Sequence, residues 1–170
     1  TFVGPGDHWL PPDNCQEHPV AAVAHRTSPT NMGLALLANL TACDFGYIPA
    51  GVLLQRTSDA MRTMTGMERH RGHFYNWYDT QSLAPLPPLY VSAVDSGNLA
   101  GALLALAEGC RELASSSSPD RSSGLLDLAT RALVLADGMS FGFLYDPQRQ
   151  LFSIGYRLAD ANVASFARPI

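Results

Sequence analysis

The sequence contains no lysine and few charges of either sign. All 11 basic residues are arginines, charged residues make up 15% of the chain, and the formal net charge is -4. Such a chain offers no positive field to phosphates, so a nucleic-acid partner is not expected. Without lysine there is also no G-x-x-x-x-G-K loop, which argues against a kinase or a nucleotide triphosphatase.

Cysteines and long hydrophobic runs are scarce too. The three cysteines (Cys15, Cys43 and Cys110) are widely spaced and form no C-x-x-C motif. A disulfide framework is therefore not expected, and a reducing compartment fits best. The apolar stretches fall short of the roughly 20 residues that span a bilayer. The first residues are rich in proline and aspartate, unlike a signal peptide. We expect a soluble segment without direct membrane insertion.

The content that remains predicts one helical domain. With 170 residues and 46% hydrophobic content, the chain can fold around one core. Apolar residues recur at helical spacing in four places, and Ser28 is a suitable N-cap for the first helix. The four predicted helices cover residues 29–44, 49–67, from an N-cap at Asp95 or Ser96 to Leu113, and 124–136.

Short extended segments and loops connect these helices. Residues 72–79 alternate aromatic and polar side chains, as an extended segment would, and together with residues 90–94 they predict a short hairpin or two extended loops. Residues 143–156 resemble a small hairpin, and residues 115–120 resemble a solvated linker. The pattern predicts an all-α array whose active face is built from its connecting loops.

Four of the connecting segments concentrate polar and aromatic side chains near helix N-termini. They cover residues 7–14, 25–31, 71–79 and 94–98. Flat rings beside carboxylates and amides suit sugars, because rings cover the C–H face and carboxylates accept from hydroxyls. The opposing interpretation is that Asp95 caps a helix and Trp77 packs in the core. The predicted sugar contacts are Trp9, Asp13, Asn14, His25, Arg26, Asn31, His73, Tyr75, Asn76, Trp77, Asp79, Asp95 and Asn98.

The carboxylates identify no catalytic pair by their spacing. Glycoside cleavage uses two carboxyl groups roughly 5–9 Å apart. Glu17, Asp79 and Asp95 are the only carboxyls with suggestive neighbours, and nothing in the sequence selects two of them. The catalytic residues stay open at this point.

Two other chemistries have weaker patterns. His70 and His73 form an H-x-x-H motif, but zinc enzymes place histidines at i and i+4 with a glutamate between. A Ser28–His25–Asp13 triad can be drawn on paper, yet no G-x-S-x-G elbow accompanies it. We expect neither a metal site nor a cofactor.

Several long motifs resemble those of the cyclic β-1,2-glucan synthases. They are WLPPDNCQEHP, VAHRTSPTN, RGHFYNWYDT and YVSAVDSGNLAG, with FLYD and LFSIGY later in the chain. The resemblance implies part of an (α/α)6 barrel with short β-hairpins in its loops. Residues 1–170 would be the N-terminal part of one glucoamylase-like domain, because twelve helices and their loops need at least ~200 residues.

The resemblance also implies an activity and a setting. The family domain acts as a retaining transglycosylase that closes linear β-1,2-glucan into a ring. It works at the cytoplasmic face of the bacterial inner membrane, between a glycosyltransferase domain and a phosphorylase-like domain. The polar loops would line its sugar cleft, and catalytic glutamates are expected farther along the domain.

Two alternatives stand beside this interpretation. The chain could be a non-catalytic piece that binds or scaffolds β-glucan, with the same loops holding sugar. It could also be a truncated, inactive product that exposes an unpaired helical face. Formation of cyclic or shortened products from linear β-1,2-glucan would distinguish catalysis from binding.

Overall fold

Four α-helices dominate the computed structural model, which describes residues 2–158. The helices are α1 (Pro29–Asp44), α2 (Ala50–Gly66), α3 (Ala93–Ser115) and α4 (Pro119–Asp137), with short 3-10 helices η1 (Pro5–Asp7) and η2 (Phe141–Leu144). The all-α class with small β-hairpins is therefore confirmed. The remaining residues of the predicted domain, Thr1 and 159–170, lie outside the described residues.

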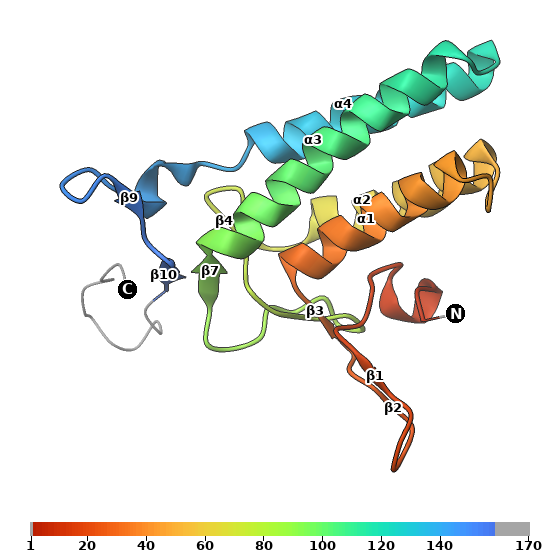
Figure 1. Cartoon of the computed structure of the whole chain (residues 1–170). Helices are drawn as coiled ribbons and strands as arrows, with labels where there is room; N and C mark the ends of the chain where they lie inside the picture. Colours follow the sequence, from red (N-terminus) through yellow and green to blue (C-terminus); the bar gives the residue numbers. More distant parts are fainter. Residues whose placement is uncertain (1, 159–170) are drawn as a thin grey trace.

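The helices form two antiparallel hairpins that pack side by side (Figure 1). The α1–α2 hairpin lies against the α3–α4 hairpin, with α1 beside α3 and α2 beside α4. Gly33 faces Ala102, and seven residues farther along both helices Leu40 faces Gly109. Equal steps in the same direction mean that α1 and α3 are parallel, so their N-terminal ends share one end of the molecule.

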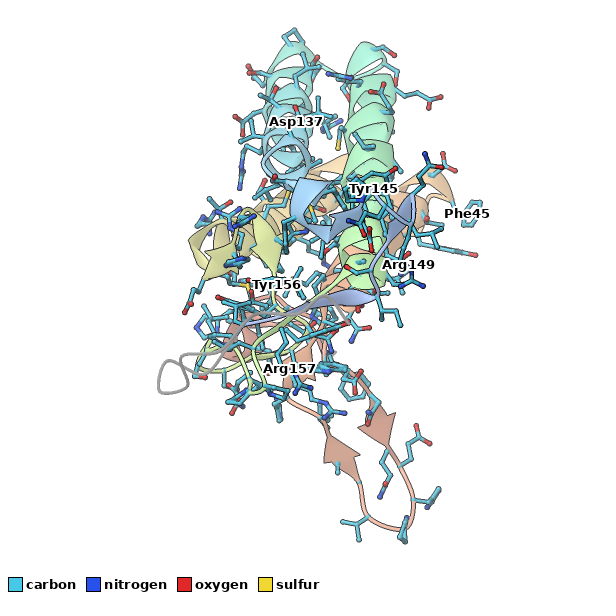
Figure 2. The ribbon with its side chains drawn as sticks, turned by 90° about the vertical axis from the view of Figure 1, so that its left-hand side faces the viewer. Phe45, Asp137, Tyr145, Arg149, Tyr156 and Arg157 are labelled. Carbon is cyan, nitrogen blue, oxygen red and sulfur yellow. The ribbon has the colours of Figure 1, made fainter. Side chains whose placement is uncertain are left out.

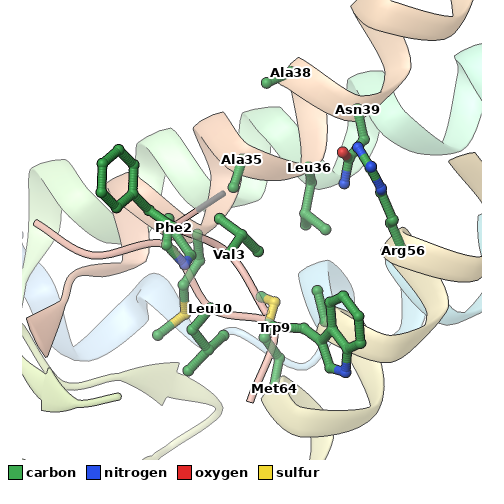
Figure 3. Close-up of a pocket in the computed structure, with 13 residues that line it drawn as sticks. Phe2, Val3, Trp9, Leu10, Ala35, Leu36, Ala38, Asn39, Arg56 and Met64 are labelled. Carbon is green, nitrogen blue, oxygen red and sulfur yellow. The ribbon is translucent and has the colours of Figure 1, made fainter. Parts of the chain in front are cut away.

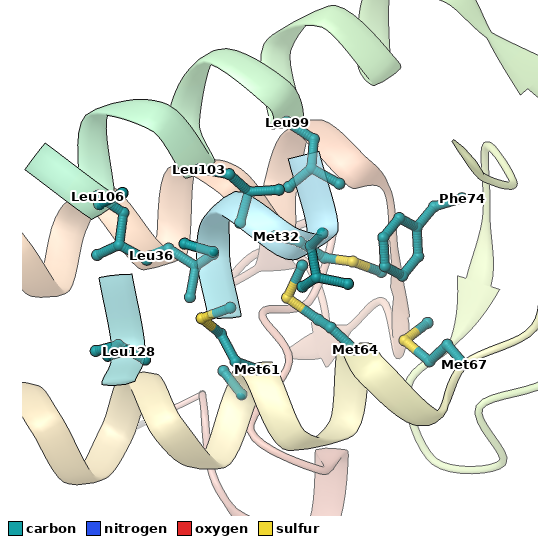
Figure 4. Close-up of a cluster of buried hydrophobic side chains, with 14 of the residues drawn as sticks. Met32, Leu36, Met61, Met64, Met67, Phe74, Leu99, Leu103, Leu106 and Leu128 are labelled. Atoms are coloured by element: carbon teal, nitrogen blue, oxygen red, sulfur yellow. The ribbon is translucent and has the colours of Figure 1, made fainter. Parts of the chain in front are cut away.

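Leucine and methionine side chains fill the space between the hairpins (Figure 4). Met32 and Leu36 of α1 meet Met61 and Met64 of α2, and all four are at most 1% exposed. The methionines of the second helix are thus core residues, as methionines on one face of a helix usually are. This packing fixes the helix ends from which the connectors leave.

Within residues 2–158, five short antiparallel strand pairs tie the connectors together. The pairs are β1 (Cys15–Gln16) with β2 (Ala22–Val23), β3 (Arg26–Thr27) with β6 (Tyr78–Asp79), β4 (Arg69–His70) with β5 (His73–Phe74), β7 (Tyr90–Ser92) with β10 (Gly155–Arg157), and β8 (Tyr145–Asp146) with β9 (Leu151–Phe152). The predicted hairpin near residues 143–156 is present as β8–β9.

Two helix starts differ from the prediction. The N-cap of α3 is Ser92, whose hydroxyl accepts from the Asp95 backbone N–H, so Asp95 and Ser96 lie inside the first turn. The fourth helix begins at Pro119, five residues before the predicted start, because proline suits the first helical position. The predicted linker over residues 115–120 is therefore shorter, because only residues 116–118 lie between α3 and α4.

The aromatic segment 72–79 is not one strand. It divides into β5 and β6, and between them the Asn76 N–H donates to the Tyr90 carbonyl across 2.7 Å. Tyr75 and Tyr78 are both buried, which strict alternation forbids for positions three apart. The bend turns Asn76 and Trp77 away from the core.

None of the helices in residues 2–158 combines the length and the apolar character needed to cross a membrane.

Candidate functional site

The four polar connectors meet beside the N-terminal ends of α1 and α3 (Figure 1). The β3–β6 pair sets Arg26 opposite Asp79, and the Thr80 N–H donates to the His25 carbonyl across 3.0 Å. Strand β7 leads directly into α3 and brings Asp95 to the same end. The structure thus joins all four segments that sequence pattern singled out.

Arg26 links the first two connectors to the third. Its Nη2 donates to Asp13 Oδ2 across 3.0 Å, and its guanidinium carbon lies 4.6 Å from the centre of the Trp77 ring. Asp13 also accepts from Asn14 and from Asn31, at 3.0 and 3.3 Å. A cation over an indole face is attractive, so Arg26 holds this ring from one side.

Asp95 is the centre of a second set of contacts. Its Oδ1 accepts from the Thr30 hydroxyl across 2.5 Å, and Thr30 in turn accepts from the Asn98 amide across 3.1 Å. With the Asn76 amide oriented so that both its groups are satisfied, its nitrogen donates to Asp95 Oδ2 across 2.9 Å. The Asn76 oxygen then accepts from Trp77 Nε1, also across 2.9 Å.

Asp7 and His25 form a third group at this end. Asp7 Oδ1 accepts from the Thr80 hydroxyl across 2.6 Å and lies 2.7 Å from His25 Nδ1. Burial raises the pKa of the Asp7 carboxyl, but the hydrogen bonds from Thr80 and His25 outweigh burial and leave this pKa below its usual value. Asp7 is therefore held as a carboxylate that fixes two connectors.

Asp79 closes the turn that follows β6. Its Oδ1 accepts from the backbone N–H of Gln81 and Ser82 and from the Ser82 hydroxyl. The Ser82 N–H is the largest cause that lowers the pKa of this carboxyl. One oxygen of this carboxylate is therefore engaged by three donors of its own loop, which fixes the side chain in the turn.

The three catalytic candidates do not come together. Asp79 and Asp95 are engaged within their own connectors, as described above. Glu17 is exposed on the β1–β2 hairpin, which extends away from the helices (Figures 1 and 2). The structure gives Asp79 and Asp95 positioning tasks and places Glu17 far from both. The triad drawn on paper is also absent, because the Ser28 hydroxyl caps α1 and His25 pairs with Asp7.

Two predicted sugar contacts lie in the core. His73 is fully buried between Ser96 and the rings of Phe141 and Phe143. Tyr75 is 3% exposed, and burial and the neighbouring Glu68 raise the pKa of its phenol. Neither side chain offers surface to a ligand, so both predictions are corrected. The reason is the bend in segment 72–79, which sends these two residues inward.

Trp9 lies apart from the polar contacts. Its ring lines a mostly apolar cavity of about 290 Å³ between the N-terminal segment, α1 and α2 (Figure 3). Met32 and Met64 form part of the wall, and Asn39 and Arg56 supply polar groups. The backbone at His8 and Trp9 adopts positive φ, at 52° and 64°. This turn separates Trp9 from its neighbour His8, whose Nδ1 lies 2.9 Å from the Thr80 carbonyl oxygen.

Sequence pattern missed three residues that join the connectors. Asp7, Thr30 and Thr80 each bridge two segments through their side chains. Threonine after an N-cap is common in any helix, so Thr30 gave no signal. Among residues 2–158, no three histidine, cysteine, aspartate or glutamate side chains gather as metal ligands.

Known proteins resemble this chain in sequence and in fold. The sequence is 42% identical over 140 residues to the cyclic β-(1,2)-glucan synthase NdvB of Rhizobium meliloti. The match covers 82% of this chain and 5% of that protein, so the chain spans a small part of its relative. No family model matches the sequence.

Solved structures share the arrangement of helices. A glucoamylase-like protein from Bacteroides fragilis superimposes with a TM-score of 0.70 at 16% identity, over 87% of this chain and 35% of that one. An endo-β-1,2-glucanase from Chitinophaga pinensis, solved with sophorotriose and glucose, gives 0.64 at 14% identity, over 88% and 38%. At these identities the likeness shows the fold. By sequence and fold together, the chain belongs with the cyclic β-1,2-glucan synthases, as a relative of one segment of such a protein with a glucoamylase-like helical architecture.

Proposed function

We propose that this chain is the N-terminal part of a β-1,2-glucan-processing domain and that its four connectors contact the glucan. The observation that carries the proposal is the convergence of Trp77, Arg26, Asp13 and Asn98 at the shared N-terminal ends of α1 and α3. Partly exposed amides, a guanidinium and an indole at one end of the molecule are the groups that sugar hydroxyls and C–H faces require.

The names of the relatives support β-1,2-linked glucose as the ligand. The sequence relative is a cyclic β-(1,2)-glucan synthase, and a structural neighbour acts on β-1,2-glucan. The proposed reaction of the whole domain is retaining transglycosylation of a linear glucan to a cyclic product. The family resemblance adds a glycosyltransferase and a phosphorylase-like domain as partners in the parent protein, at the cytoplasmic face of the inner membrane.

Trp77 is the proposed ring platform. Arg26 covers one face of the indole, so a glucose unit would stack on the opposite face. Asn98 and Arg26 would then face the hydroxyl groups at the rim of the sugar. In this proposal Asp13 and Asp95 hold those groups in place and do not transfer protons.

Replacing Trp77 tests the proposal. We expect Trp77→Ala to weaken binding of β-1,2-gluco-oligosaccharides by about tenfold, since covering one aromatic face contributes roughly 1.4 kcal/mol. Titration calorimetry measures the affinity, and circular dichroism verifies that the variant is folded.

Tyr47→Ala is the matched control. Tyr47 is 80% exposed in the α1–α2 loop, at the opposite end of α1. Equal affinities for the wild-type chain and the Trp77 variant would contradict the placement of the sugar on Trp77. Equal losses of affinity in the Trp77 and Tyr47 variants would show that the loss is not specific to Trp77.

A binding role without bond cleavage is the second candidate. It is favoured by the engagement of Asp79 and Asp95 within their own loops and by the remote place of Glu17. In that case the described residues hold the glucan, and the cleaving carboxylates belong to other parts of the domain.

A further inference from the structure

We infer that Asp95 is a positioning residue that orients Trp77 through the Asn76 side chain. The effect on sugar affinity rests on the proposed function, whereas the orientation of the indole by Asp95 and Asn76 does not. Two connectors supply the three groups in this chain of contacts: Asp95 in the first turn of α3, and Asn76 and the Trp77 indole at the bend before β6.

The direction of each hydrogen bond is fixed by the carboxylate. An ionised carboxylate only accepts, so the Asn76 group that faces Asp95 Oδ2 must be its NH₂. The Asn76 oxygen consequently faces Trp77, and an indole N–H only donates. The amide orientation that suits the acid is therefore also the one that suits the indole.

Asp95 is itself held from a second side. The Thr30 hydroxyl donates to its other oxygen across 2.5 Å, and Ser92 Oγ accepts from its backbone N–H across 3.1 Å. With both carboxylate oxygens occupied and its backbone in the first turn of α3, Asp95 has a fixed orientation. Arg26 then restrains the indole from its face, 4.6 Å from the ring centre.

Truncating Asp95 removes the acceptor that orients the Asn76 amide. In Asp95→Ala the Asn76 amide nitrogen loses its acceptor, so the side chain is free to rotate away and leaves the Trp77 N–H without its acceptor for part of the time. We expect the indole N–H of Trp77 to exchange with solvent roughly tenfold faster, the factor that corresponds to losing one hydrogen bond of about 1.4 kcal/mol.

The test measures exchange of the two indole N–H signals by nuclear magnetic resonance, with Trp77→Phe assigning the Trp77 signal. Faster exchange of Trp77, with Trp9 unchanged, supports the inference. Unchanged exchange of Trp77 overturns it. Should Asp95→Ala fail to fold, Asn76→Ala tests the contact between the amide and the indole without altering α3. Unchanged exchange of Trp77 in that variant overturns the inference, and faster exchange supports the second of its two contacts.

Asp120→Ala is the matched control. Asp120 also lies in the first turn of a helix, α4, and is exposed. An equal increase in Trp77 exchange in this variant would mean general loosening of the fold, and it would overturn the positioning role.

Sugar affinity provides the second readout. Asp95→Ala should weaken β-1,2-gluco-oligosaccharide binding severalfold in the wild-type background and leave it nearly unchanged when Trp77 is already phenylalanine, because that variant lacks the N–H. Equal losses in both backgrounds overturn the coupling. If the wild-type chain binds no glucan, the proposed function fails, and the exchange rates still decide the positioning role.

Discussion

At the scale of single residues, His73 shows how burial assigns a task that sequence pattern cannot. Its imidazole is fully buried, with Nδ1 2.9 Å from the Ser96 hydroxyl oxygen and two phenylalanine rings at its edges. Burial lowers the pKa of His73, and burial likewise lowers the pKa of the neighbouring His70. Both histidines are therefore kept neutral by the folded state.

Acid should destabilise the chain through these two groups. The unfolded imidazoles have a pKa near 6.5 and bind protons that the folded protein rejects, so the free energy of unfolding falls as the pH drops below about 6.5. His73→Gln keeps a polar partner for Ser96 and removes the titration. We expect a smaller loss of stability between pH 7.5 and pH 5 in this variant, measured by urea unfolding at each pH. A loss as large as in the wild-type chain would contradict this.

Residue types predicted many of the side chains that gather at the site, but they did not predict which of those side chains are exposed. Asp13, Arg26, Asn76, Trp77, Asp95 and Asn98 do gather as their types and loop positions predicted. Tyr75 and Trp77 are two positions apart, which in an extended segment would place them on one face. The Asn76–Tyr90 backbone contact instead bends the chain between them. A contact between residues 14 apart leaves no periodic trace in sequence.

At the scale of elements, helix starts depend on individual capping side chains. The Ser28 hydroxyl accepts from the Asn31 N–H and the Ser92 hydroxyl from the Asp95 N–H, while Ser118 at the start of α4 makes no such bond. Sequence predicted the first cap. It misplaced the second because Asp95 and Ser96 are equally suitable cap residues and only packing selects among them.

Removing the hydroxyl groups of Ser28, Ser92 and Ser118 should change the stability of the chain by different amounts. Ser28→Ala and Ser92→Ala are each expected to lower the free energy of unfolding by about 1 kcal/mol, and Ser118→Ala to leave it nearly unchanged. Thermal and urea unfolding measure the three variants. A cost at Ser118 equal to that at Ser28 would show that the hydroxyl bond is not the cause.

Close approach of α1 and α3 depends on Gly33. A Cβ atom there would lie 2.9 Å from the Ala102 Cβ, whereas a Cβ at the exposed Gly101 meets nothing within 4 Å. Gly33→Ala should therefore destabilise the chain by about 1–3 kcal/mol through overpacking. Gly101→Ala should stabilise it by about 1 kcal/mol through helix propensity. Urea unfolding tests the pair, and a stabilising effect at Gly33 would contradict the contact.

At the scale of the whole molecule, local sequence signals predicted the helices better than the pairing of the strands that connect them. Helical spacing and the cap at Ser28 indicated four helices and their chain order. The pairing of β7 with β10 joins residues about 65 positions apart in sequence, and it depends on how the two hairpins pack. Such pairing carries no local signature, so the path of residues 140–158 back to the start of α3 was not predicted.

The chain alone is expected to bind glucan without cutting it. Incubation with linear β-1,2-glucan should give neither cyclic nor shortened products by mass spectrometry, because the described carboxylates that lie near the sugar contacts are engaged in positioning. Products from the wild-type chain that disappear in Asp79→Asn or Asp95→Asn would assign catalysis to this segment and contradict the expectation.

The parallel course of α1 and α3 has an electrostatic consequence for this end of the molecule. Each helix presents the positive pole of its macrodipole there, equivalent to roughly half an elementary charge. Two such poles, together with Arg26, help to accommodate four carboxylates (Asp7, Asp13, Asp79 and Asp95). The remaining excess of negative charge repels anionic saccharides, whereas an uncharged glucose polymer approaches without that penalty.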